Sequence, residues 1–210
     1  MRILSFDPAN STGWAVTEIL DDKAVIIDYG DFSISPSEFM GDRCNEMFNK
    51  TTSMIVGMDI NFVTIESYFF SRLTANGSNV NAAFRTAIHM ACRQLKTDYE
   101  ILNISAWKRC IAGRSTPTKE QKKQYGKAKA NKAFIQQALW TRFGIKFPNH
   151  SISEKTGKPV LPRNDYIDAV SMAIYYANAF MNITKPNISC SVVPVPDVKM
   201  KKTKKAFKYE

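Results

Sequence analysis

The first sixteen residues, MRILSFDPANSTGWAV, constrain the fold more than any other stretch of the chain. An apolar run through Phe6 ends in Asp7, and after Pro8 and a few small polar residues the chain resumes as Gly13-Trp14-Ala15-Val16. Pro and Asn interrupt strands while β-branched and aromatic residues favour them, so the pattern predicts strand, tight turn, strand. Asp7 then ends a strand buried on both faces, where an unpaired carboxylate is costly. It either accepts hydrogen bonds from the turn amides or holds a metal ion together with other carboxylates.

Length and composition indicate one domain with a hydrophobic core. The chain has 210 residues, of which 44% are hydrophobic and 23% charged, as is ordinary for a globular protein. No apolar run approaches the ~18 residues of a membrane span, and the beginning is not a secretory signal, so we expect an intracellular protein with no membrane partner. The four cysteines are scattered and form no Cys-x-x-Cys pair, which argues against a zinc site and against disulfides.

The net charge of +10 is concentrated in two segments. Residues 108–132 carry nine Lys and Arg against Glu120, and residues 199–210 carry six Lys against Glu210. The rest of the chain is close to neutral, and this segregation favours a polyanionic partner, nucleic acid first. Either lysine run can also be solvated surface, and the second is compatible with a nuclear address. Gly126-Lys127 does not complete a phosphate-binding loop, which argues against a nucleotide triphosphatase.

The order of apolar runs and breakers predicts the architecture. Apolar alternation predicts a meander of three strands, and the helix ahead of the fourth strand predicts that this strand runs parallel to the first. The expected strands are 2–7, 13–20, 24–34, 61–66 and 100–104, and the expected helices are 36–58, 80–96, 106–112, 128–143 and 164–182. Ser35, Pro36 and Glu38 predict a capping box for the first helix. Segments 113–127 and 144–163 are expected to be loops.

These elements predict an α/β fold with a mixed five-stranded sheet and helices on both faces. The first and fourth strands would be neighbours near its centre. Residues 1–183 would form the domain, and residues 184–210 a flexible tail rich in Pro and Lys, with no fold of its own.

Four acids occupy the ends of predicted elements. Asp7 and Glu66 end two strands that are expected to be parallel neighbours, and Asp165 and Asp168 lie on one face at the start of the last helix. Acids in a first helical turn also favour the helix dipole. Four carboxylates in one pocket need cations, and oxygen ligands select Mg²⁺ or Mn²⁺. Two such ions ~3.5–4 Å apart stabilise the attacking and leaving oxygens of a phosphodiester displacement.

Three stretches, SFDPANSTGWA, VTIESYFF and NDYIDAVSMAI, resemble the RuvC-type Holliday junction resolvases of the RNase H-like superfamily. The resemblance covers roughly residues 1–182 and implies an RNase H-like fold. It also implies that Asp7, Glu66, Asp165 and Asp168 are catalytic acids that bind two Mg²⁺ or Mn²⁺ ions. Phe69 would stack on a base near the centre of the junction, which is worth ~1–3 kcal/mol, although it and Phe70 can also pack under a loop.

The chain departs from the family pattern in two places. The usual Asp-Pro-Gly is here Asp7-Pro8-Ala9, so the turn must avoid a positive φ at Ala9 or adopt it at some cost. The lysine-rich insertion after the fifth strand is similar to viral and phage members. Lys108 and Lys132 are expected near the scissile phosphate, and Lys127 and Lys129 along the DNA backbone.

The resemblance implies a metal-dependent endonuclease for four-way junctions, acting in DNA recombination and repair. Paired cuts leaving 5′-phosphates would require a homodimer, with the helices 36–58 and 80–96 as candidates for its face. The protein would be located with the DNA, in the nucleus or in a viral replication compartment. Two alternatives stay open: an RNase H-like nuclease for flaps, branched DNA or RNA–DNA hybrids, and a non-catalytic nucleic-acid-binding protein.

Overall fold

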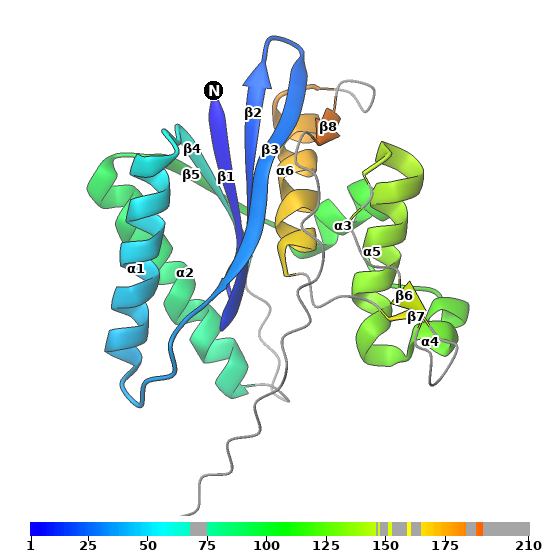
Figure 1. Ribbon diagram of the computed structural model, residues 1–210, viewed down its shortest axis with the longest axis horizontal. Coiled ribbons are helices and arrows are strands. Elements are labelled where there is room, and N and C mark those ends of the chain that lie inside the picture. Colours follow the sequence, from blue (N-terminus) through cyan, green and yellow to red (C-terminus); the bar gives the residue numbers. More distant parts are fainter. Residues whose placement is uncertain are drawn as a thin grey trace, which may run out of the picture.

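A central sheet with helices on both faces organises the molecule (Figure 1). The computed structural model describes residues 1–67, 75–145, 147, 151–152, 159–160, 165–183 and 188–190, with the backbone alone at 75–78, 127–128, 151–152 and 159–160. None of the helices in these ranges is long and apolar enough to cross a membrane.

The sheet has the order β5-β4-β1-β2-β3-β8. Its strands are β1 Arg2–Asp7, β2 Ser11–Leu20, β3 Lys23–Ser33, β4 Phe62–Glu66, β5 Asp98–Leu102 and β8 Ile188–Cys190. β1, β2 and β3 form the expected antiparallel meander, and β4 pairs with β1 in parallel. The prediction of a mixed sheet in which β1 and β4 are central neighbours is therefore confirmed. All strands except β2 run toward the same edge, which we call the carboxyl edge; the opposite one is the amino edge.

The helices divide into two layers (Figure 1). α1 Met40–Gly57 and α2 Ala75–Leu95 cover one face. α6 Tyr166–Phe180 crosses the other face, with α3 Ile104–Ala112, α4 Lys119–Tyr125 and α5 Lys127–Phe143 outside it. Alternation along β1 explains the layers, because Leu4 and Phe6 join the core under α1 and α2 while Ile3 joins the core under α6. Because side chains alternate along β1, the side chain of Asp7 lies on the same face as Ile3, the face that α6 covers.

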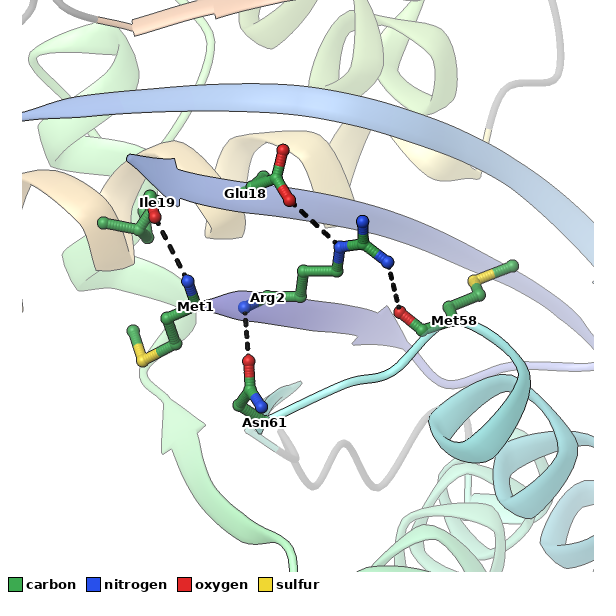
Figure 2. A network of polar contacts seen from close by, with 6 residues as sticks. All are labelled: Met1, Arg2, Glu18, Ile19, Met58 and Asn61. Atoms are coloured by element: carbon green, nitrogen blue, oxygen red, sulfur yellow. Dashed lines mark hydrogen bonds and ion pairs between the residues drawn. The ribbon is translucent and has the colours of Figure 1, made fainter. Parts of the chain in front are cut away.

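A polar network fixes the amino edge (Figure 2). The guanidinium of Arg2 donates to Glu18 Oε1 at 3.1 Å and to the carbonyl oxygen of Met58 at 3.1 Å. The backbone amide of Arg2 donates to Asn61 Oδ1 at 2.7 Å, which ties β1 to the segment leading into β4. The amino terminus of Met1 donates to the carbonyl oxygen of Ile19 at 3.1 Å. These bonds fix the register of β1, β2 and β4 at the amino edge.

Three helices differ from expectation: α1 and α2 begin elsewhere, α2 at Ala75 rather than at residue 80, and α4 was not expected. The capping box predicted from Ser35 and Glu38 is wrong, because α1 begins at Met40 with no side-chain cap at Phe39. The backbone amide of Ser35 instead donates to Glu46 within α1, so the preceding residues stay outside the helix. α4 lies in a segment expected to be a loop, and Thr118 and Gln121 form its capping box. Its short run of lysines hid this signal.

The central sheet has six strands in the described residues, one more than expected. Ile188–Cys190 forms β8, parallel to β3 at Ala24–Ile26, within the segment expected to have no fold. Ile188 is buried in the core under α6, and this burial holds a strand too short to be visible in the sequence pattern. A second correction concerns 144–163, expected to be a loop, in which β6 Ser151–Ile152 and β7 Pro159–Val160 form a two-stranded ladder. The division at residue 183 otherwise stays a prediction.

Candidate active site

A row of four positions crosses the sheet at the carboxyl edge. Phe6 pairs with Ile65, so Asp7 and Glu66 follow side by side on β1 and β4. Asp7 pairs in turn with Gly13, and Gly13 pairs with Asp31 on β3. Paired residues on adjacent strands direct their side chains to the same face, here the face under α6. The row Glu66–Asp7–Gly13–Asp31 therefore presents three carboxylates and one gap to the start of α6.

The start of α6 fits into the gap at Gly13. A Cβ atom on Gly13 would lie 2.1 Å from the carbonyl oxygen of Asp165 and 2.6 Å from the amide nitrogen of Tyr166, contacts that no real side chain makes. The absence of a side chain at residue 13 thus permits backbone contact between β2 and the residue that precedes α6. Asp165 and Asp168 come to the acids of the strands through this contact. The glycine of the first motif is explained by packing, because its neighbour is a helix start.

Asp7, Glu66 and Asp168 form an electrostatically coupled group. Burial, followed by repulsion from Glu66 and Asp168, raises the pKa of Asp7 well above its usual range. Burial and the charge of Asp168 raise the pKa of Glu66 to about 7. Burial also raises the pKa of Asp168, although Lys108 and Lys132 partly oppose the shift. Three buried carboxylates with raised pKa values concentrate negative charge away from water, and such clusters are typical of functional sites.

Helix α3 supplies two groups to Glu66. Asn103 caps α3 by accepting hydrogen bonds from the amides of Ser105 and Ala106, which places Trp107 one turn into the helix. The indole nitrogen of the fully buried Trp107 donates to Glu66 Oε1 at 3.2 Å. Lys108 lies over the Trp107 ring at 5.0 Å, and its charge acts on both Glu66 and Asp168. Trp107 therefore orients the carboxylate that Lys108 partly neutralises.

Helix α5 supplies Lys132, whose ammonium forms an ion pair and hydrogen bond with Asp165 Oδ1. Burial alone would lower the pKa of Lys132, but the bond to Asp165 and the charges of Asp165, Asp168 and Asp7 outweigh it and raise that pKa. The side chain of Asp165 does not cap α6; it is directed to Lys132 instead.

The donor set of this site fits a hard divalent cation. All of the acids offer oxygen, and Asp7, Glu66 and Asp168 repel one another. Among the residues that the structure describes, however, no three Asp, Glu, His or Cys side chains are already placed to share one ion. Asp165 is paired with Lys132. The four acids are neighbours, and their role as metal ligands stays a prediction.

The turn after β1 resolves the question raised by Ala9. The non-glycine residues with positive φ in the described ranges are Asp21, Asp59, Lys96 and Asn182, so Ala9 avoids that region. The hydroxyl of Thr12 donates to the carbonyl oxygen of Ala9 at 2.7 Å and accepts from its amide at 3.2 Å. Thr12 is fully buried and closes the turn without a glycine.

The remaining predicted residues have different outcomes. Lys129 is exposed, one turn ahead of Lys132 on α5. Lys127 is the first residue of α5, but its side chain lies outside the described part of the structure, and Phe69 lies outside it altogether. Sequence reasoning missed Trp107 and Asp31 as neighbours of the acids. The one signal in the sequence for Trp107 was its position directly before Lys108, a predicted site residue after the fifth strand.

Comparisons of sequence support a relationship to one group of nucleases. No protein-family profile matches the chain. The crossover junction endodeoxyribonuclease RuvC of Dictyoglomus thermophilum is 26% identical over 122 residues, which are 58% of this chain and 77% of that protein. RuvC of Prochlorococcus marinus is 28% identical over 122 residues, 58% of this chain and 76% of that protein.

Solved structures agree in fold. RuvC of Thermus thermophilus, determined in complex with a Holliday junction substrate, superposes with a TM-score of 0.61 at 17% identity and covers 87% of this chain and 97% of its own. The yeast mitochondrial Holliday junction resolvase Ydc2 superposes with a TM-score of 0.52 at 8% identity, covering 82% and 75%. The similarity to viral and phage members stays a prediction. The resemblance read from the three motifs is confirmed by these comparisons: the chain is similar in sequence to RuvC resolvases over 58% of its length, and it shares the fold of Thermus thermophilus RuvC.

Proposed function

We propose that this protein is a metal-dependent endonuclease that resolves four-way DNA junctions. The observation that carries the proposal is the coupled group of Asp7, Glu66 and Asp168, held at the carboxyl edge of a RuvC-like fold with Lys108 and Lys132 beside it. A protein that only binds DNA through its positive charge gains nothing from buried carboxylates facing phosphate. The acids therefore favour hydrolysis over the non-catalytic alternative.

The reaction proposed is hydrolysis of one phosphodiester bond. The oxygen of water bonds to phosphorus, the bond from phosphorus to the 3′ oxygen breaks, and that oxygen takes up a proton, leaving a 5′-phosphate. Mg²⁺ or Mn²⁺, two ions per site, would supply charge stabilisation for the attacking and leaving oxygens. Asp7, Glu66, Asp165 and Asp168 are the proposed ligands, with Asp7 central because it lies between Glu66 and the start of α6.

The other groups have supporting roles in this proposal. Trp107 holds one oxygen of Glu66 through its indole N–H, which limits the orientations of that carboxylate. Lys108 and Lys132 place positive charge beside the acids, where a phosphate could bind. Lys127 and Lys129 on the outer helix α5 would contact the DNA backbone, and Phe69 would stack on a base at the junction centre.

A homodimer is part of the proposal, because a junction with two-fold symmetry is cut at two symmetric positions. Support comes from the layer of α1 and α2, on the opposite face from α6. A groove of about 550 Å³ between these helices is lined by Phe48, Ala87 and Met90, among others, and Met90 is 60% exposed. Analytical ultracentrifugation tests this assignment, and a monomer at the concentrations that give paired cleavage would contradict it.

The decisive experiment compares the wild type with Asp7→Asn on a synthetic four-way junction, a flap and an RNA–DNA hybrid, each with Mg²⁺ or Mn²⁺. We expect the wild type to cut the junction in preference, and Asp7→Asn to lose about 10³-fold or more in rate while still binding the junction. Arg109→Gln, on α3 next to Lys108, is the control that removes one charge near the site without changing a proposed ligand. Equal cutting by Asp7→Asn and wild type would refute the site, and equal cutting of the hybrid would favour the RNase H-like alternative.

A further inference from the structure

Lys132 and a divalent cation would compete for the same carboxylate. The ammonium of Lys132 is bonded to Asp165 Oδ1, and Asp165 is one of the four proposed ligands. Its carbonyl oxygen is fixed against Gly13 on β2, so the backbone of Asp165 has little freedom and its side chain must choose between partners. A cation that takes the Asp165 carboxylate leaves Lys132 in need of another negative group.

Asp31 is the candidate that the sheet register supplies. It pairs directly with Gly13 across β2 and β3, so its side chain lies on the same face and next to the gap that receives Asp165. Because Gly13 has no side chain, nothing from the intervening strand separates Asp31 from the start of α6. The charges of Asp165 and Lys132 both act on Asp31: burial and Asp165 raise its pKa, and Lys132 opposes the shift.

The side chain of Asp31 also has no competing partner in the described part of the structure, where it forms no hydrogen bond or ion pair. The other acid of the same strand, Asp28, differs in this respect, since it accepts a hydrogen bond from the amide of Tyr29 at 2.8 Å. Asp31 is exposed, so solvent can reach it and Lys132 can move to it without a rearrangement of the core. An unused carboxylate thus lies beside the Lys132–Asp165 pair.

We propose that Asp31 is a positioning residue that takes over Lys132 when Asp165 turns to a divalent cation. This inference rests on the proposed function, because it assumes that Asp165 is a ligand. Transfer to Asp31 removes the competing ammonium from Asp165 and yet keeps a positive charge at the site, where the phosphate of the DNA would bind. Without Asp31, Lys132 either stays on Asp165 and opposes the cation or is released to solvent.

The test is a double-mutant cycle on Mn²⁺ binding, measured by calorimetry with the full chain and no DNA. We expect Asp31→Asn to weaken Mn²⁺ binding roughly two- to fivefold, as loss of one exposed charge pair does. In the Lys132→Met background, where Asp165 has no competitor, Asp31→Asn should change the affinity by less than about 1.5-fold. Asp31→Glu keeps the carboxylate and should restore the wild-type value, and Asp28→Asn on the same strand is the matched control.

The outcomes separate this inference from the proposed function. If Asp31→Asn weakens Mn²⁺ binding equally in the wild-type and Lys132→Met backgrounds, Asp31 acts only through the electrostatic field of its charge. That result would overturn the proposed transfer of Lys132. Absence of Mn²⁺ binding by the wild type would overturn both the inference and the metal chemistry of the proposed function. In cleavage assays, the defect of Asp31→Asn should shrink as Mn²⁺ is raised, because excess cation displaces Lys132 from Asp165 by mass action. A defect independent of Mn²⁺ concentration would also contradict the transfer.

Discussion

The two edges of the sheet solve the problem of charge in opposite ways. At the amino edge, the guanidinium of Arg2 forms an ion pair with Glu18 and donates a hydrogen bond to the carbonyl oxygen of Met58 (Figure 2). The charge of Arg2 is therefore balanced by a neighbouring residue of opposite charge. At the carboxyl edge, the same β1 and its neighbour β4 end in Asp7 and Glu66. Burial raises the pKa of both, together with repulsion from Glu66 and Asp168 at Asp7 and from Asp168 at Glu66.

The unfavourable electrostatic free energy of this fold is concentrated at the carboxyl edge. The ion pair at the amino edge is partly exposed, with side chains 39% and 27% accessible, and such pairs contribute ~0–1 kcal/mol to stability. The described residues at the carboxyl edge place five acids, Asp7, Asp31, Glu66, Asp165 and Asp168, around two lysines. Like charges buried together are costly, so we expect this edge to be a functional site that destabilises the protein when no cation is bound.

The largest effect is expected from Gly13→Ala. The added methyl carbon would lie 2.1 Å from the carbonyl oxygen of Asp165, so α6 must shift away from β2 and carry Asp165 and Asp168 with it. We expect cleavage to fall at least about 100-fold and stability to fall by ~1–3 kcal/mol or more. Junction cleavage and urea unfolding measure the two effects.

Gly57→Ala is the matched control, because no atom lies within 4 Å of the position of its added Cβ. It should keep wild-type cleavage. A Gly13→Ala protein that cuts at the wild-type rate would show that the helix start need not touch β2, and the contrast between the edges would lose its structural basis.

An intermediate effect is expected from Glu66→Gln, and the size of this effect on stability depends on pH. Because the folded state raises the pKa of Glu66 from 4.5 to about 7, the folded protein binds this proton more tightly than the unfolded chain. The resulting stability is present at low pH and is lost as the pH rises from about 4.5 through about 7. Glu66→Gln should therefore stabilise the protein at pH 8, on the order of 3 kcal/mol, and have little effect near pH 4.

Thermal unfolding at the two pH values checks this prediction. Adding Mn²⁺ at pH 8 should raise the Tm of the wild type more than that of Glu66→Gln, because the cation compensates the charge of the carboxylate. A Glu66→Gln protein that is less stable than the wild type at pH 8 would reverse the expected sign and contradict the account of the carboxyl edge.

The smallest effect is expected from Glu18→Gln at the amino edge. Arg2 keeps its hydrogen bond to the carbonyl oxygen of Met58, so only a partly exposed ion pair is lost. Stability should fall by less than about 1 kcal/mol, and junction cleavage should not change. A loss of cleavage above roughly tenfold in Glu18→Gln would show that the two edges are coupled, and the comparison between them would fail.

Local sequence signals predicted where Asp7 and Glu66 lie, and they predicted the surroundings of these acids poorly. Asp7 and Glu66 could be placed at the ends of parallel neighbouring strands because apolar runs and the intervening helix determine strand direction. The start of α1 could not be predicted, because the amide of Ser35 is bonded to Glu46 within the helix rather than to a local cap. β8 escaped detection because three residues carry no periodic pattern, and contact with β3 and burial of Ile188 hold it in place.

The residues that tune the acids had almost no signal in the sequence. Trp107 reaches Glu66 from 41 positions away, and Asp31 joins the row through a β-ladder rather than through a motif. Long-range contacts of this kind depend on how α3 and β3 pack, which spacing along the chain does not encode.

Local patterns in the chain were enough to predict the parallel pairing of β1 with β4 and the positions of Asp7 and Glu66 at the ends of these strands. The pairing of Asp165 with Lys132, the room that Gly13 leaves for the start of α6, and the positions of Trp107 and Asp31 beside the acids depend on packing between elements. The physical reason is that the charge state and orientation of a carboxylate depend on burial and on neighbours from other elements. Those neighbours are fixed only when the helices pack on the sheet.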